Sequence, residues 1–271
     1  MIFYLGAQEP WWGWNGAAGG PLIISANRIL ERCLATRGGW RRGKSRPLRA
    51  TAPLFIDSGA FSQVARGGFK LGARQYAELI QNFVRETGPV DAVGIQDWMC
   101  EPWILEQTGL PLEEHQRRTV QSFLTLSEIC PDLPWVPTLQ GFTLDDYRRC
   151  ADLYATAGVG LADRMVGVGS VCRRSKTAEI GTLLGGIKAH LPRALLHGYG
   201  VKGPGVLRAL GALTSCDSMA WSLRARWVSN EARARGEEVK SLANSQTFAE
   251  QWRSLMLEEI RRVHDQKNIH L

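Results

Sequence analysis

The chain has 271 residues, a hydrophobic fraction of 44% and a formal net charge of +7. It can bury a full core, and we expect one domain over residues 1–271, because a (β/α)8 barrel takes about 250 residues. No apolar run approaches the roughly twenty residues that cross a membrane, and no basic segment opens a signal peptide, so we expect a cytoplasmic protein. Arginines outnumber lysines, which favours an anionic partner, since guanidinium groups suit phosphates and base edges.

Six cysteines are spread along the chain without a metal-site pattern. None forms a Cys-x-x-Cys pair, and none lies beside a histidine at the spacing of a zinc site. They are Cys33, Cys100, Cys130, Cys150, Cys172 and Cys216. We therefore expect buried, reduced thiols, and we predict neither a metal nor another cofactor.

Eight short apolar runs alternate with helical patterns along most of the chain. The runs lie at residues 2–5, 22–25, 53–57, 91–95, 135–139, 164–168, 194–198 and 213–217. Helices are predicted at 74–86 and 113–130, where apolar residues recur at helical spacing, and Thr143 is the expected cap of a third helix. Strands that alternate with helices form parallel sheets, and eight of them favour a closed (β/α)8 TIM barrel.

One segment, residues 36–51, is basic and rich in glycine, and it departs from this alternation. It could be a solvated linker. Alternatively, Arg41, Arg42 and Lys44 contact phosphates and Trp40 stacks on a base.

Two other stretches favour packing. Apolar residues recur at helical spacing over 245–265, which predicts a helix on the outside of the barrel. Trp11, Trp12 and Trp14 follow the first apolar run, and we interpret them as packing residues more than as a substrate platform.

Polar side chains lie at or just after the ends of several apolar runs. Three are carboxylates and one is a carboxamide: Asp57, Asp97, Asp217 and Gln140. In a parallel barrel the carboxyl ends of the strands converge on one rim, where active sites lie. The arrangement predicts a site for a polar heterocycle. Alternatively, Asp57 and Asp217 could cap a turn or helix, and Asp97 and Gln140 could form buried hydrogen bonds.

These stretches resemble motifs of the tRNA-guanine transglycosylases. Residues 57–61, Asp-Ser-Gly-Ala-Phe, are similar to that family's Asp-Ser-Gly-Gly-Phe, and residues 139–141, Leu-Gln-Gly, to its Val-Gln-Gly-Gly turn. Residues 166–169, Val-Gly-Val-Gly, look like its glycine pair, and 197–200, His-Gly-Tyr-Gly, occupy the place of Met-Gly-Val-Gly. Residues 215–218, Ser-Cys-Asp-Ser, correspond to the segment with the catalytic aspartate.

The chain also departs from that family. Members that act on tRNA carry a zinc subdomain with three cysteines and a histidine, whereas no cysteine follows Asp217 here, and Phe142 replaces the second glycine of the turn. This zinc-less barrel resembles the DpdA branch, which phages and bacterial DNA-modification clusters encode. The run 217–222, Asp-Ser-Met-Ala-Trp-Ser, supports the assignment. The resemblance implies exchange of guanine in DNA for a free 7-deazaguanine in its cyano, aminomethyl or amidino form, in the cytoplasm of a bacterium or a phage-infected host.

The resemblance also implies roles for individual residues. Asp217 is the expected nucleophile that forms a glycosyl ester, and Asp57 the expected proton donor and acceptor. The base is expected to lie against Ser58, Phe61, Asp97, Gln140, Gly167, Val168, Gly169, His197 and Gly198. In this group Asp97 and Gln140 read the base edge, a backbone N–H near Val168 or Gly169 is a second donor, and Phe61 and His197 sandwich the ring.

Some of these roles have competing interpretations. His197 could be a packed, satisfied histidine, and Arg224 and Arg226 either hold DNA phosphates or are solvated surface charges. The same chemistry on tRNA is the nearest alternative function. A hydrolytic N-glycosylase and a barrel that only binds nucleic acid are the others.

Overall fold

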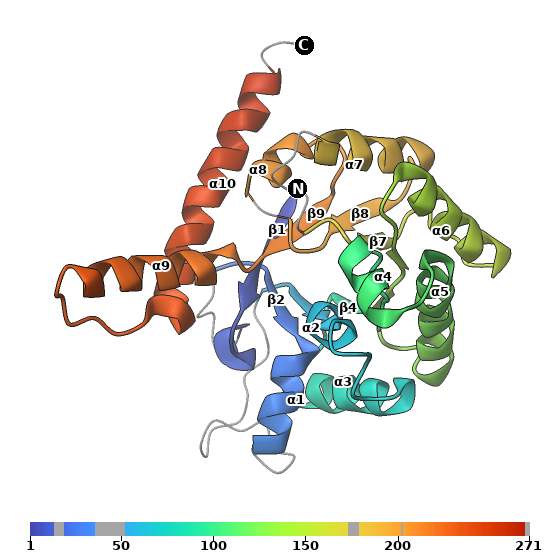
Figure 1. Ribbon diagram of the computed structural model, residues 1–271, viewed down its shortest axis with the longest axis horizontal. Helices are drawn as coiled ribbons and strands as arrows, with labels where there is room; N and C mark the ends of the chain where they lie inside the picture. Colours follow the sequence, from blue (N-terminus) through green and yellow to red (C-terminus); the bar gives the residue numbers. More distant parts are fainter. Residues whose placement is uncertain (14–18, 36–51, 173–178, 202, 269–271) are drawn as a thin grey trace.

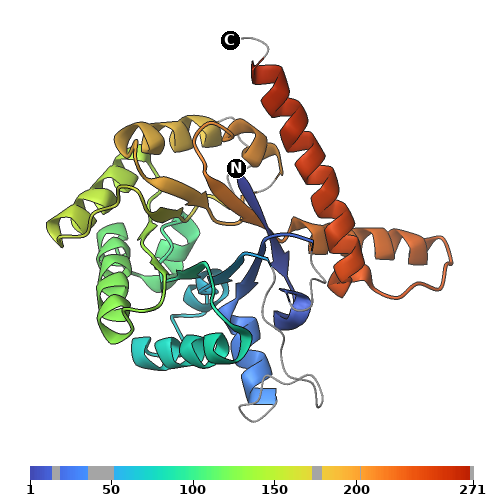
Figure 2. The ribbon, with the colours of Figure 1, turned by 180° about the vertical axis from the view of Figure 1, so that it is seen from behind.

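A computed structural model of the chain describes residues 1–13, 19–35, 52–172, 179–201 and 203–268. Its centre is a parallel sheet that curves into a barrel, with helices around the outside (Figures 1 and 2). The strands are β1 (Ile2–Ala7), β2 (Leu22–Ser25), β3 (Leu54–Asp57), β4 (Ala92–Gly94), β5 (Trp135–Val136), β6 (Thr138–Leu139), β7 (Met165–Val168), β8 (Leu195–Gly198) and β9 (Ser215–Ser218).

The barrel closes at a proline. The strand order is β5-β4-β3-β2-β1-β9-β8-β7-β6, so its two end strands, β5 and β6, are separated in the chain by Pro137 alone. β5 pairs with β4, and β6 pairs with β7. Proline has no N–H to donate, but the Pro137 carbonyl accepts a 2.9 Å hydrogen bond from the Gly167 N–H. β5 and β6 are therefore two halves of one barrel strand, and the predicted eight-stranded TIM-type barrel is confirmed.

The helices mostly follow the strands. They are η1 (Pro10–Gly13), α1 (Ala26–Ala35), α2 (Ala60–Val64), α3 (Ala73–Thr87), α4 (Pro102–Thr108), α5 (Leu112–Ile129), α6 (Leu144–Thr156), α7 (Glu179–His190), α8 (Gly203–Arg208), α9 (Ala220–Ala234), η2 (Leu242–Asn244) and α10 (Gln246–Asn268). In Figure 1, α3, α5, α6 and α7 surround the barrel, whereas α9 and α10 extend away from it. No described helix is long and apolar enough to cross a membrane.

The predicted helices are confirmed with small shifts at their ends. Those expected at 74–86 and 113–130 are α3 and α5, which differ by one residue at each end. Thr143 caps α6 as expected: its hydroxyl accepts from the Asp146 N–H, and the Asp146 carboxylate accepts from the Thr143 N–H. The C-terminal helix is α10, and its Trp252 ring lies 5.9 Å from the Phe3 ring on the outside of the barrel.

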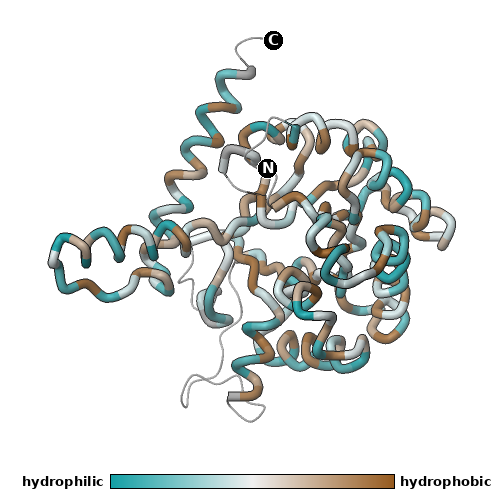
Figure 3. The backbone as a smooth tube through the Cα atoms, viewed as in Figure 1, coloured by the Kyte–Doolittle hydropathy of each residue, from teal (hydrophilic) through white to brown (hydrophobic). Residues whose placement is uncertain are grey.

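Alternate residues of the strands form two apolar layers. On β1, Phe3 and Leu5 belong to the layer between the barrel and its helices, whereas Tyr4 belongs to a separate cluster with Phe55 of β3 and Val136 of β5. Because side chains alternate across a strand, this second cluster lies inside the barrel. Figure 3 shows hydrophobic residues along the strands and a mixture of hydrophobic and hydrophilic residues on the outer helices. The inner cluster packs beneath the residues at the carboxyl ends of the strands.

Candidate active site

The carboxyl ends of the strands surround a pocket of about 440 Å³. Six of the predicted site residues line it: Asp57, Phe61, Asp97, Gln140, Gly169 and Asp217. They come from the ends of β3, β6, β7 and β9, from α2, and from the loop after β4. Among the residues that the structure describes, no lysine or arginine lines the pocket. Its carboxylates therefore lie together without a neighbouring cation in that lining.

Asp57 ends β3 and lies at a tight turn. Its Oδ2 accepts a 2.9 Å hydrogen bond from the Gly59 N–H. Gly59 has a φ of 75°, which favours glycine, and a Cβ there would overlap the Asn27 amide. Burial raises the pKa of Asp57 to about 7, and the charges of Asp217 and Asp97 add to the rise. Asp57 can therefore hold or release a proton near neutral pH.

Asp217 lies within β9 and is held from the side of β8. Its Oδ1 accepts a 2.8 Å hydrogen bond from the Gly200 N–H, and Nε2 of His197 lies 3.4 Å from the same oxygen. The other ring nitrogen, Nδ1 of His197, lies 2.9 Å from the Ser215 hydroxyl. Among the described residues, no hydrogen bond reaches Oδ2 of Asp217. One oxygen is thus fixed, and the other is available to the pocket.

Asp97 is the third carboxylate of the pocket and accepts hydrogen bonds on both oxygens. The Ser58 hydroxyl donates to Oδ1 at 3.0 Å, and the Gln140 amide donates to Oδ2. Burial raises the pKa of Asp97 to about 6 and the charge of Glu101 also raises it, while these hydrogen bonds and one from its own backbone N–H act in the opposite direction. At neutral pH Asp97 is therefore mainly an ionised acceptor.

Ser170 and Glu101 extend this network along the pocket wall. The Ser170 hydroxyl lies 2.7 Å from Oε1 of Gln140 and 2.8 Å from Oε2 of Glu101, and it accepts from the Cys100 N–H at 2.8 Å. A hydroxyl has one proton, so it donates to one of the two oxygens at a time. The Gln140 amide is consequently oriented at both ends, by Asp97 and by Ser170.

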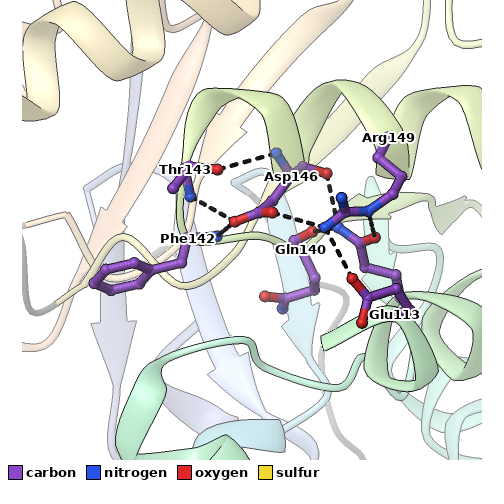
Figure 4. Close-up of polar contacts among 7 residues, drawn as sticks. Glu113, Gln140, Phe142, Thr143, Asp146 and Arg149 are labelled. Atoms are coloured by element: carbon purple, nitrogen blue, oxygen red, sulfur yellow. Dashed lines mark hydrogen bonds and ion pairs between the residues drawn. The ribbon is translucent and has the colours of Figure 1, made fainter. Parts of the chain in front are cut away.

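The backbone of Gln140 is fixed by a second layer of polar contacts. Nε2 of the buried Gln116 side chain lies 2.7 Å from the carbonyl oxygens of both Gln140 and Asp146. Asp146 in turn pairs with Arg149 at 2.7 Å and closes the capping box with Thr143 (Figure 4). The start of α6 therefore sets the direction in which the Gln140 side chain enters the pocket.

Two glycines of the Val-Gly-Val-Gly segment make room for side chains. A Cβ on Gly169 would overlap the Gln140 amide, and one on Gly167 would overlap the Tyr199 ring. The sequence predicted a backbone N–H near Val168 or Gly169 that donates to the base. Of these two residues, Gly169 has its N–H engaged by the Leu139 carbonyl at 3.0 Å. Because these two glycines have no Cβ, the Gln140 and Tyr199 side chains can occupy the adjacent space.

His197 does not lie in the pocket wall. It is fully buried inside the barrel, with its ring 4.7 Å from Phe55 and 4.8 Å from Tyr199. Val168 is fully buried, and a Cβ on Gly198 would meet Val201. The structure therefore places His197 beneath Asp217, and not beside a ring in the pocket. Tyr199, two residues further on, lines the pocket.

The predicted nucleic-acid contacts either do not line the pocket or lie outside the described residues. Arg224 and Arg226 are exposed on α9. Trp40, Arg41, Arg42 and Lys44 lie outside the residues that the structure describes. Trp12 is buried against Trp221, with ring centroids 5.4 Å apart, which fits its interpretation as a packing residue. No metal-holding group of three or more His, Cys, Asp or Glu residues occurs in the described part of the chain.

Several residues that line the pocket were not among the predicted site residues. They are Met99, Glu101, Ser170, Tyr199, Met219 and Leu223. Glu101 carried a signal, since it is a carboxylate shortly after Asp97 and directly before Pro102 at the start of α4. Ser170 follows Gly169 with a φ of 54°, a conformation that sequence alone does not reveal.

Comparison with protein families identifies the chain. The model of the DpdA family, described as DeoxyPurine in DNA protein A, matches residues 1–270. The chain belongs to this family, as the resemblance predicted, and its function lies in DNA modification related to a deazapurine. No curated protein matches the chain.

Proposed function

We propose that this DpdA-family enzyme exchanges guanine in DNA for a free 7-deazaguanine base through a covalent ester on Asp217. The observation that carries the proposal is a pair of carboxyl groups in different surroundings that line one pocket. Burial and the charge of Asp217 raise the pKa of Asp57 to about 7, whereas Asp217 is oriented by the Gly200 N–H. A swap that retains configuration needs one nucleophilic carboxylate and one proton carrier.

In the first half-reaction, Oδ2 of Asp217 attacks C1′ of the target deoxyguanosine. The C1′–N9 bond breaks, and its electron pair leaves with the purine. Asp57, with a pKa near 7, still carries a proton in part of the population at neutral pH and transfers it to the departing guanine. Asp217 is then esterified to the sugar, and Asp57 is ionised.

In the second half-reaction, Asp57 accepts the N9 proton of the incoming base. N9 attacks C1′ from the face that guanine left, the ester bond breaks, and Asp217 returns as a carboxylate. One C–N bond has broken and one has formed, and Asp57 has regained its proton. The cycle is neutral in protons and in oxidation state.

The pocket supplies groups for both purines. The Asp97 carboxylate can accept from N1–H and the 2-amino group. The Gln140 amide carries two N–H donors; one is directed to Asp97, which leaves the other for O6. Phe61, which is 42% exposed and lines the pocket, offers an aromatic face. We propose that the incoming base is the cyano, aminomethyl or amidino form of 7-deazaguanine.

Incorporation of labelled base tests the proposal. The full chain is incubated with duplex DNA and each isotopically labelled 7-deazaguanine, and the digested nucleosides and intact protein are measured by mass spectrometry. We expect labelled deoxynucleoside, an equal amount of free guanine, and a protein–DNA adduct when the free base is omitted.

The other outcomes identify the alternatives. Guanine release without incorporation would indicate a hydrolytic glycosylase that leaves abasic sites. Incorporation into unmodified tRNA and not into DNA would indicate the tRNA reaction, and binding with neither event would indicate a non-catalytic barrel. Each of these results overturns the proposal.

A further inference from the structure

The first half of α9 carries an exposed apolar ridge beside the pocket. Met219, the N-cap residue of α9, is followed at intervals of four residues by Leu223 and Trp227, which places the three along one side of the helix. They are 39%, 67% and 49% exposed. Large apolar side chains in a contiguous exposed row mark interaction surfaces. We call these three residues the α9 ridge.

The α9 ridge is continuous with the pocket. Met219 and Leu223 both line it, so the ridge begins at the pocket wall and runs outward along the helix. The start of α9 is firmly anchored: Trp221 is fully buried and its Nε1 donates to the Gly6 carbonyl at 2.8 Å. A Cβ on Gly6 would overlap the Met219 side chain, so glycine at this position leaves room for Met219. Leu223 therefore stands on a fixed support at the mouth of the pocket.

Cationic side chains border the ridge. The Arg224 guanidinium lies 4.3 Å from the Trp227 ring centroid, and Arg226 is exposed on the same half of the helix. The first acidic residue of α9 is Glu231, one turn beyond Trp227. An apolar row between arginines suits the stacked bases and phosphates of a nucleic acid.

We infer that Leu223 is the wedge that enters duplex DNA when the target guanine leaves the base stack. The inference rests on the proposed function, because a base inside a duplex cannot reach the buried Asp217 unless it turns out of the helix. Its departure leaves a gap between neighbouring bases, and proteins fill such gaps with apolar side chains. Leu223 is the most exposed residue of the ridge and adjoins the pocket that receives the base.

DNA suits the ridge better than a second copy of the chain does. A symmetric contact through α9 would bring Arg224 and Arg226 of both copies together around the apolar row, with like charges facing each other. DNA phosphates neutralise the same arginines. The ridge also adjoins the pocket, which fits DNA, because DNA carries the base that would enter the pocket.

The test compares one guanine in two settings. Base exchange is measured for wild type, Leu223→Ala and Leu223→Met, with the target guanine paired in a duplex and in the same oligonucleotide as a single strand. Leu255→Ala is the matched control, because Leu255 is 65% exposed but lies on α10. We expect Leu223→Ala to lower kcat/KM on duplex at least about tenfold more than on single strand, as one leucine inserted into the gap predicts. Leu223→Met and Leu255→Ala should keep the wild-type ratio.

A second measurement reports the opened duplex directly. In an Asp217→Asn background, 2-aminopurine is placed next to the target guanine, and its fluorescence rises when neighbouring bases unstack. The rise should be present with Leu223 and absent with Leu223→Ala. Equal losses on duplex and single strand, or a change in oligomeric state measured by light scattering, would overturn the wedge while leaving base exchange established. If wild type exchanges no base on either DNA, the proposed function itself fails.

Discussion

The Gly200 N–H holds Oδ1 of Asp217 with a 2.8 Å hydrogen bond. Gly200 has a φ of 61°, and a Cβ there would lie 3.0 Å from that of Cys172, so glycine suits this position. Nε2 of His197 lies 3.4 Å from the same oxygen without a hydrogen bond to it, so the Gly200 N–H is the group that orients this carboxylate among the described residues. If Asp217 is the nucleophile, as we propose, this orientation avoids part of the entropic cost of reaching the sugar.

Asp217→Asn should abolish base exchange and leave DNA binding within about threefold of wild type. The amide keeps the shape and can still face Gly200 through its oxygen, but it cannot form the glycosyl ester. Labelled-base incorporation and fluorescence anisotropy with the same duplex measure the two effects. A variant that kept a substantial share of wild-type turnover would remove Asp217 from the nucleophile role.

Asp57→Asn should stabilise the protein at alkaline pH. The pKa of Asp57 is raised from 3.8 to about 7, so the folded state binds this proton more tightly than the unfolded state does. The contribution of this raised pKa to the free energy of unfolding is fully present below about pH 4 and is lost as the pH rises through about 7. Asparagine carries no charge at any pH. The difference in free energy of unfolding between the variant and wild type should therefore be on the order of 2–4 kcal/mol larger, in favour of the variant, at pH 8 than at pH 4.

Urea unfolding at both pH values measures this difference. Asp132→Asn, at an exposed turn, is the control and should show the same difference from wild type at both pH values. A stability gain for Asp57→Asn that does not depend on pH would show that the Asp57 carboxyl is not held at a raised pKa.

Gly169→Ala should weaken binding of the free base. The added methyl group overlaps the Gln140 amide, which cannot move away without giving up its hydrogen bonds with Asp97 and Ser170. We expect KM for the free base to rise about tenfold and stability to fall by about 1–3 kcal/mol. Gly185→Ala on α7 is the control, since a Cβ there meets nothing within 4 Å. An unchanged KM for Gly169→Ala would exclude the amide orientation as a determinant of base binding.

The barrel was predictable because its evidence is local. Each strand is a short apolar run that the sequence shows directly. The run at 135–139 is still recognisable as one strand, although Pro137 divides it into β5 and β6. The carboxylates were predictable for a related reason: in a parallel barrel, a polar residue at the end of an apolar run faces the rim. Asp57, Asp97 and Asp217 do line one pocket.

The remaining pocket residues depend on details that periodicity does not determine. His197 lies inside β8 and Tyr199 just beyond its end, so a shift of one or two residues in the strand end decides which ring reaches the pocket. Glu101 and Ser170 come from loops after β4 and β7, whose paths depend on single φ values and on contacts such as Cys100 N–H to Ser170. Such contacts exist only once the chain has folded.

The basic segment 36–51 should govern DNA affinity more than chemistry. It lies outside the described residues, so its role stays a prediction. Neutralising Arg41, Arg42 and Lys44 together should weaken binding and reduce the log–log slope of affinity against salt by up to about three, at roughly 0.7–0.9 for each phosphate that the variant no longer neutralises. Anisotropy titrations between about 50 and 200 mM salt, a range over which such slopes are resolved, measure it. An unchanged slope would identify the segment as a solvated linker.

The roles that we propose for Asp217 and Asp57 can be tested with a modified leaving group. If Asp57 supplies the proton that guanine needs, alkylation of the target guanine at N7 should replace that proton, because it weakens the bond to C1′. In Asp57→Asn, alkylated DNA should therefore give the covalent Asp217 adduct, which intact-mass measurement detects.

Transfer onto the incoming base should stay blocked in the same variant, since the N9 proton still needs an acceptor. A 7-deazapurine has carbon at position 7 and cannot be activated there, so the exchange should also be close to irreversible in wild type. Asp217→Asn should give no adduct on either DNA, which makes it the control for adduct formation. If Asp57→Asn formed product at the wild-type rate, or if Asp217→Asn accumulated the adduct, the roles assigned to the two aspartates would be wrong.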